Sequence, residues 1–143
     1  MLSPLSDFIH DVFEQLVISP HDADATAALD TFFAPNFEEI NVATGVVLDL
    51  AEYRKLVHST RAQLTDRKLV SDKFILATPA DPTHRTGGGA VIHVFTALQD
   101  GKRVTVTIVG VVRIEWVVDH KHGHQEGGSR RIVTESLIMN TSP

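Results

Sequence analysis

The sequence predicts an α+β fold, a cone-shaped half-barrel in which three N-terminal helices pack in a strongly curved, mostly antiparallel sheet. Three observations carry this prediction. Apolar residues at helical spacing dominate the first half of the chain, and long runs rich in β-branched residues fill the second half. The length of 143 residues, with 43% hydrophobic and 22% charged residues, fits one globular domain over 1–143.

Two helices are expected at the start of the chain. Apolar residues recur at helical spacing over 5–16, with Ser3 as the expected N-cap and Pro4 in the first turn. A second amphipathic segment covers 23–33, and Pro35 should end it. Both helices therefore have one apolar face to bury.

Two polar features that follow are each open to two interpretations. The strand expected over 37–42 turns either Glu38 or Glu39 inward, and exposed carboxylates are the commoner case. The capping box at 49–52 begins a third helix and places Tyr53 near its start. Tyr53 is then either a core residue or a phenol whose hydroxyl faces a cavity.

The second half centres on a β-hairpin over 89–118. The Asp100-Gly101 dipeptide between its two runs suits a two-residue turn, because both central positions need a positive φ. Such a turn fixes the register of the two strands. The pairs expected on the inner face are Ala97 with Val104, Phe95 with Val106, His93 with Ile108 and Val91 with Gly110, and that face continues with Val112, Ile114, Trp116 and Val118.

His93 and Gly110 stand out on this apolar face. A strand histidine is either a hydrogen-bonded core residue or the titratable group of a pocket. A strand glycine either marks a bulge or bend or makes room for a ligand. The functional interpretation of the two together is a pocket whose wall carries one imidazole.

Loops are expected on both sides of the hairpin. The first, over 79–89, ends in three glycines that lead into a strand and not a helix, so phosphate-loop and dinucleotide motifs do not fit and no redox cofactor is expected. The second, over 119–131, is rich in glycine and contains His120, His122 and His124. It lacks a second cluster at the spacing of structural metal sites, which favours a solvated loop without a resident metal.

The last strand, over 130–140, follows the hairpin, and another is expected over 68–77. We assign Val133, Leu137 and Met139 to the inner face of the last strand, because they are larger than the residues of its other face. This assignment brings Glu135 inward as well, near His93.

Composition excludes several classes of partner. The net charge is −5 and the basic residues are scattered, which argues against nucleic acid as a partner. Cysteine is absent, the N-terminus lacks a signal-peptide pattern, and no apolar run approaches the ~20 residues of a membrane span. We therefore expect a cytoplasmic protein with no nucleic-acid or membrane partner.

Three segments carry a resemblance to a known family. They are 101–115 followed by 131–135, which look like paired C-terminal strands, and 32–37, which looks like a second helix running into a first strand. On these segments the chain resembles the SnoaL-like branch of the nuclear transport factor two-like (NTF-2-like) superfamily, the cystatin-like α+β cone.

The resemblance implies a range of activities. The family includes polyketide cyclases, dehydratases, isomerases and epoxide hydrolases, together with members that only bind a ligand or a partner. Many of its cyclases carry an inward Asp where this chain has Gly110, so that group does not transfer. Scytalone-dehydratase-like members pair two inward histidines with an Asp, and this chain offers His93. Family homodimers form through the outer sheet face, which here includes Val109 and Val111.

These observations favour an isomerase, dehydratase or cyclase that acts by general acid/base chemistry on a small, apolar, oxygenated molecule without cofactor or metal. His93 and Glu135 are the expected catalytic pair. The expected substrate-binding residues are Tyr53, Phe95, Ile108, Gly110 and Trp116. The alternative is a ligand-binding or dimerisation module of the same fold that performs no reaction.

Overall fold

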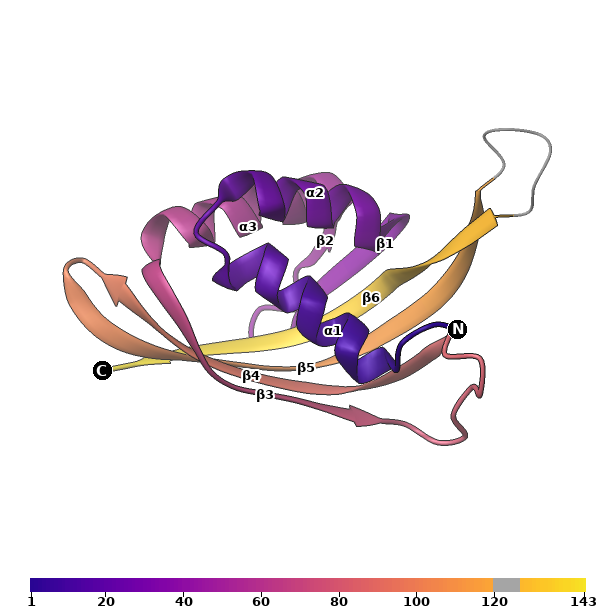
Figure 1. Ribbon diagram of the computed structural model, residues 1–143. Coiled ribbons are helices and arrows are strands. Elements are labelled where there is room, and N and C mark those ends of the chain that lie inside the picture. Colours follow the sequence, from indigo (N-terminus) through magenta and orange to yellow (C-terminus); the bar gives the residue numbers. More distant parts are fainter. Residues whose placement is uncertain (120–126) are drawn as a thin grey trace.

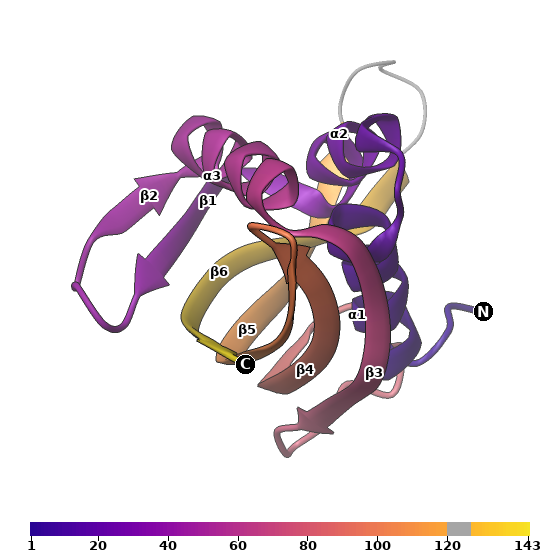
Figure 2. The ribbon, with the colours of Figure 1, turned by 90° about the vertical axis from the view of Figure 1, so that its left-hand side faces the viewer.

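The computed structural model describes residues 1–119 and 127–143. Within these ranges, helices lie across the concave side of one curved six-stranded sheet that does not close into a barrel (Figures 1 and 2). The elements in chain order are α1 (Leu5–Phe13), a π-helical turn η1 (Glu14–Ile18), α2 (Asp22–Phe32), β1 (Phe33–Asn41), β2 (Val47–Asp49), α3 (Leu50–Gln63), β3 (Thr65–Leu76), β4 (Gly87–Gln99), β5 (Lys102–Asp119) and β6 (Gly127–Ser142). The predicted α+β half-barrel is confirmed.

The sheet is mostly antiparallel, as expected. Its strands follow the order β2-β1-β6-β5-β4-β3, and β1 runs parallel to β6. The β4–β5 register is the predicted one, with His93 opposite Ile108 and Val91 opposite Gly110. Asp100 and Gly101 in the turn have φ values of 53° and 78°, because a two-residue hairpin turn requires both to be positive.

Two helix boundaries differ from the sequence prediction. Pro4, and not Ser3, is the N-cap of α1, and no side chain caps this end. α2 ends earlier than expected, and Pro35 lies inside β1. The pairing of β1 with β6 shifts register between Phe33 and Glu38, so a residue without an N–H group is accommodated there.

Glycines 87–89 are part of β4 and not of a loop, contrary to the prediction. A Cβ atom on Gly89 would lie 2.2 Å from the carbonyl oxygen of Ile75 and 2.8 Å from the ring of Phe74. Neighbouring β3 approaches too closely for a side chain at this position. The glycines therefore serve strand packing.

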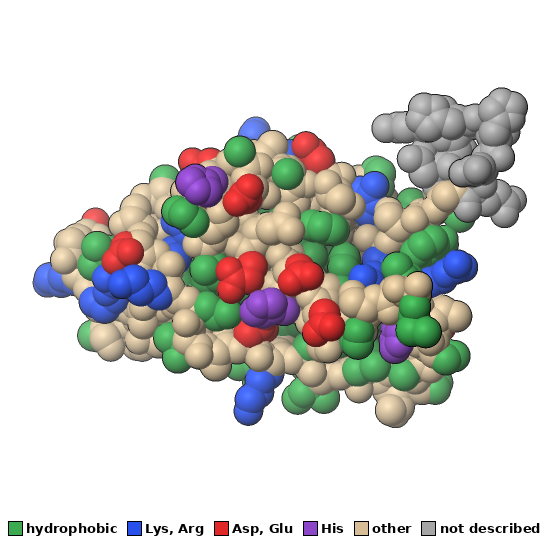
Figure 3. Space-filling model, in the orientation of Figure 1, with side chains coloured by type: hydrophobic (Ala, Val, Ile, Leu, Met, Phe, Trp, Pro, Cys, Tyr) green, Lys and Arg blue, Asp and Glu red, His purple; other side chains and the backbone are tan. Residues whose placement is uncertain are grey.

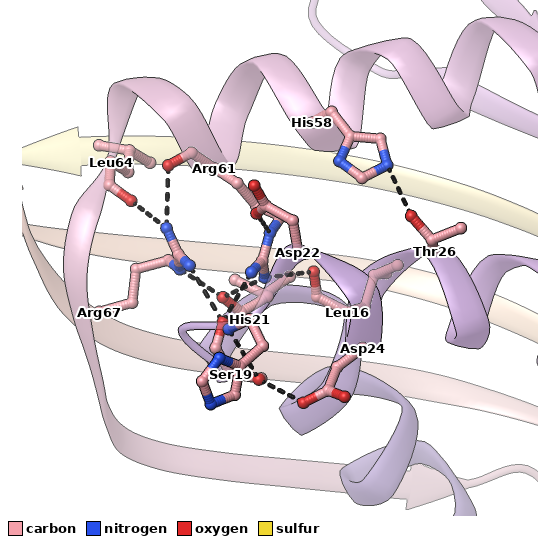
Figure 4. Close-up of polar contacts among 11 residues, drawn as sticks. Leu16, Ser19, His21, Asp22, Asp24, Thr26, His58, Arg61, Leu64 and Arg67 are labelled. Atoms are coloured by element: carbon pink, nitrogen blue, oxygen red, sulfur yellow. Dashed lines mark hydrogen bonds and ion pairs between the residues drawn. The ribbon is translucent and has the colours of Figure 1, made fainter.

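Two arginines tie the turn after η1 to α3 and β3 (Figure 4). The guanidinium groups of Arg61 and Arg67 both donate to the carbonyl oxygen of Ser19, at 2.8 and 3.0 Å. Arg61 is buried and also pairs with Asp22 at 2.9 Å. The turn that ends the first helical segment is thereby held against the rim of the sheet.

In the described ranges no helix is long and apolar enough to cross a membrane. His120, His122 and His124 lie outside the described residues.

Candidate active site

A small cavity lies between the helices and the concave face of the sheet. Its volume is about 60 Å³, and its lining is apolar apart from the side chains of His93, Tyr53 and Glu135. A second cavity of about 150 Å³ adjoins it, and Glu39 is among its lining residues. The two cavities share Val17, Tyr53, Ile108 and Leu137. They therefore lie side by side inside the cone, and each is lined by both apolar and polar residues.

His93 is held on the wall of the first cavity by Asp72 and Phe13. Asp72 on β3 is the cross-strand partner of His93, and its Oδ1 lies 2.7 Å from Nδ1 of His93. This nitrogen has no well-directed hydrogen bond among the described residues, so the contact is one of distance and charge. The Phe13 ring packs on the imidazole with ring centroids 3.8 Å apart.

Burial lowers the pKa of His93, and the nearby Asp72 carboxylate opposes this effect without overcoming it. The imidazole is therefore neutral at pH 7. Because Nδ1 is turned toward Asp72, Nε2 is the nitrogen left to act on a molecule in the cavity. A neutral imidazole in this position can accept a proton.

A bulge in β3 explains why Asp72 faces inward. Leu69 pairs with Phe95 and Ser71 pairs with Val94, so Val70 is an extra residue on the β3 side. Strict alternation from Leu69 would turn Asp72 outward, and the extra residue returns it to the inner face. Asp72 thus reaches His93 through an irregularity of the strand.

Three further polar groups gather on the opposite side of the space. Glu135 on β6 and Glu39 on β1 are register partners, and both are buried. The hydroxyl of Tyr53 donates to Oε2 of Glu135 at 3.3 Å. Tyr53 in turn packs against Phe33 and Phe37, with ring centroids 5.5 and 4.9 Å away.

The two carboxyl groups hold their protons well into the neutral range. Burial, together with the charge of Glu39, raises the pKa of Glu135 to about 8, although the Tyr53 hydrogen bond acts in the other direction. Burial raises the pKa of Glu39 to about 7. Burial also raises the pKa of Tyr53 well above its usual value. At neutral pH Glu135 is therefore a carboxylic acid that can donate a hydrogen bond.

The predicted catalytic residues line the same cavity, but the predicted pairing between them is wrong. The carboxylate beside His93 is Asp72, whereas Glu135 bonds to Tyr53. The inward face of β6 also needs one correction: Ile132, and not Val133, is buried, because a register shift opposite Arg113 makes Val133 the extra residue. Glu135 nevertheless faces inward, as predicted.

The predicted binding residues divide between the cavities and other places. Ile108 lines both cavities, and Phe95 lines the second. Trp116 lines neither: it is half-buried near the end of β5, and the Arg85 guanidinium stacks on its ring with its carbon 4.4 Å from the ring centroid. Trp116 instead lines a separate pocket at the surface, together with Met1, Leu2 and Arg85.

Gly110 does not make room for a substrate, contrary to the prediction. A Cβ atom there would lie 2.2 Å from Cδ2 of Leu137 and 2.6 Å from the carbonyl oxygen of Ser136. The missing side chain admits Leu137 from β6, and Leu137 is the residue that lines the cavities.

Sequence reasoning missed Asp72, and it left open whether Glu38 or Glu39 faces inward while favouring exposed carboxylates; the structure buries Glu39. For Asp72 a signal exists: in strict alternation it shares a face of β3 with Phe74, a large apolar residue. For Glu39 the signal is Phe37, whose large side chain shares its face in strict alternation. No group of three or more His, Asp or Glu side chains suited to a metal ion occurs in the described part of the chain.

Comparison with known proteins gives structural matches only. No protein-family model and no curated protein matches the sequence. A candidate polyketide cyclase from Acidithiobacillus ferrooxidans superposes with a TM-score of 0.56 at 18% identity, covering 98% of this chain and 91% of that one. An NTF-2-like protein of unknown function from Pseudomonas aeruginosa gives a TM-score of 0.51 at 14% identity, covering 95% and 94%.

A third solved structure agrees with these two. It is a candidate SnoaL-like polyketide cyclase from Mesorhizobium loti, with a TM-score of 0.50 at 14% identity, covering 95% of this chain and 99% of that one. Identities this low speak for the fold alone. The chain therefore has the cone fold of the NTF-2-like and SnoaL-like proteins, and the resemblance drawn from its sequence is confirmed at the level of fold.

Proposed function

We propose that the chain is a cofactor-independent enzyme that moves a proton next to the carbonyl group of a small apolar molecule, as an isomerase, dehydratase or cyclase does. The observation that carries this proposal is the presence in the lining of one cavity of a neutral imidazole, His93, and a protonated carboxyl group, Glu135. A base and an acid with opposed pKa perturbations in one dry space are typical of acid/base catalysis.

The reaction proceeds by a proton transfer at each end of the substrate. Nε2 of His93 takes a proton from the carbon beside the carbonyl, the electron pair of that C–H bond forms a carbon–carbon double bond to the carbonyl carbon, and the π pair of the C=O bond moves to oxygen. Glu135, oriented by Tyr53, donates a hydrogen bond or its proton to that oxygen. The resulting enol is reprotonated elsewhere, expels a β-hydroxyl group as water, or attacks a second carbonyl to close a ring.

The shape of the site restricts the substrate. The cavities of about 60 and 150 Å³ are each smaller than the ~300–1,000 Å³ typical of sites for drug-sized ligands. The lining of the smaller cavity is apolar apart from His93, Tyr53 and Glu135. The larger cavity exposes mostly apolar surface, and its polar lining residues are Glu39, Asn41, Tyr53, Thr60, Arg61 and Arg67. A compact ketone or hydroxyketone of largely hydrocarbon surface suits this space.

Proton exchange tests the proposal without knowledge of the natural substrate. The protein is incubated in D₂O with a panel of small cyclic ketones and β-hydroxyketones, and loss of the α-proton signals is followed by NMR. We expect exchange above the buffer rate that His93→Gln abolishes and His58→Gln leaves intact, because the half-buried His58 contacts Thr26 and lines neither cavity. Saturable binding of these compounds without exchange would instead support the ligand-binding module. If the compounds neither bind nor exchange their protons, the proposal is contradicted.

A further inference from the structure

The carboxylate of Asp72 has a histidine on each side. Its Oδ1 lies 2.7 Å from Nδ1 of His93, and its Oδ2 lies 2.6 Å from Nδ1 of His10 on α1. The side chain of His93 is 9% exposed, that of Asp72 is 11% exposed and that of His10 is 47% exposed. One carboxyl group thus connects the cavity wall to the surface of the protein.

The imidazoles of His10 and His93 are both next to the negative charge of the Asp72 carboxylate. When His10 is protonated, its charge is paired with Asp72, and less of that carboxylate's field remains to stabilise a proton on His93. When His10 is neutral, Asp72 acts fully on His93. The two histidines therefore compete for one counter-charge across the wall of the cone.

From this geometry we propose that His10 is a positioning residue of the cavity: through the shared Asp72, the protonation state of this surface histidine sets how strongly His93 binds a proton. The effect on turnover rests on the proposed function, whereas the coupling between the two histidines does not. A proton on His10 makes His93 a weaker base. As the pH falls, protonation of His10 at the surface therefore lowers the basicity of His93 before His93 itself is protonated.

The surroundings of both rings agree with this order of protonation. His10 faces Asp72 on β3, Glu14 at the start of η1 at 3.9 Å, and Asp11 on α1, and these acidic groups raise its pKa. Figure 3 shows acidic side chains gathered over α1 on this face. His93 faces Asp72 and, beyond it, His10, whose charge lowers the pKa of His93 in addition to burial. His10 therefore takes its proton first as the pH falls.

NMR titration of the histidine ring protons tests the coupling in the whole protein. His10→Gln removes the charge and keeps a hydrogen-bond donor, and we expect the pKa of His93 to rise by about half a unit or more, a ~3-fold or larger change in proton affinity. His10→Lys carries a permanent charge and should keep the pKa of His93 low. A merely structural role for His10 would not make the pKa of His93 depend on whether the replacement is charged.

The outcomes are separable from those of the proposed function. His58→Gln is the matched control, because it removes a histidine that contacts Thr26 on α2 and not Asp72, and it should leave the titration of His93 unchanged. If the pKa of His93 is the same in wild type, His10→Gln and His10→Lys, the inference is wrong, whatever the ketone-exchange assay shows. If the coupling is present but no ketone exchanges its protons, the proposed function fails and the inference stands.

Discussion

Glu39 and Glu135 lie opposite one another on the parallel strands β1 and β6, and both carboxyl groups are buried in the cone. Two carboxylates this close inside an apolar space cannot both be ionised without a large cost in free energy. At neutral pH, at least one of the two carboxyl groups is therefore protonated. The pair titrates as a unit, and its behaviour links the stability of the fold to the chemistry of the cavity.

Glu135→Gln should change how stability depends on pH. The pKa of Glu135 is raised from 4.5 to about 8 in the folded protein, so the folded state binds the proton more tightly than the unfolded chain does. This contribution is fully present below pH 4.5 and is lost as the pH rises toward 8. We expect the variant to lose less stability than wild type between pH 5 and pH 8, by on the order of a few kcal/mol, as measured by urea unfolding across this range. Parallel curves for the two proteins would contradict the raised pKa.

His93→Gln should reduce turnover by about 10²–10⁴-fold while the fold persists, because the amide cannot accept a proton. The ketone-exchange rate measures the loss, and circular dichroism reports the fold. If the variant keeps the wild-type exchange rate within a few-fold, His93 takes no part in the reaction.

Asp72→Asn should lower the pKa of both histidines that it contacts. The carboxylate raises the pKa of His10 and opposes the lowering of the pKa of His93, and the amide supplies no charge. We expect both ring-proton titrations to move to lower pH, and we expect exchange activity to fall by about tenfold for each unit lost by His93. Lys73→Gln, a neighbouring change on the exposed face of β3, serves as the control.

Gly110→Ala should destabilise the fold by about 1–3 kcal/mol, because its Cβ would overlap Leu137 and the Ser136 carbonyl group. Unfolding in urea measures the loss. Gly127→Ala is the control, since a Cβ there meets no atom within 4 Å. Equal stability of the two variants would show that β6 can move away from β5.

We propose that two copies of the chain pair through the outer sheet face, as the resemblance implies. Val109 and Val111 on β5 and Ile138 on β6 are exposed there, and Val109 is the cross-strand partner of Ile138. Light scattering at micromolar concentration should give twice the chain mass of 15.7 kDa for wild type and the single mass for Val111→Lys. Val70→Lys, on the edge strand β3, should stay dimeric, and a wild-type mass of 15.7 kDa would exclude the dimer.

The elements that the sequence predicts well are those fixed by local chemistry. The two-residue turn at Asp100 and Gly101 determines the whole β4–β5 register, and so it places His93 on the inner face without knowledge of the rest of the fold. The capping box that begins α3 is present, with Asp49 and Glu52 exchanging hydrogen bonds, and it brings Tyr53 to the cavity.

The partners of the site depend on contacts between distant segments, and these were not predictable in the same way. Asp72 meets His93 because β3 pairs beside β4 and contains a bulge, and neither follows from alternation. Glu39 meets Glu135 because β1 runs parallel to β6, and the choice of neighbouring strand is a property of the assembled sheet.

The extra residue in β3 also has a consequence for how the chain can vary in length. Removing Val70 would leave Leu69 opposite Phe95 and Asp72 opposite His93, because the pairing is regular over 68–69 and again over 71–76. A deletion at the bulge is therefore absorbed by loss of the extra residue, while a deletion beyond Asp72 would turn the rest of β3 to the other face of the sheet. Among natural relatives of this chain, alignment gaps in this strand should cluster at position 70, and the acidic residue two positions later should keep its place opposite the histidine.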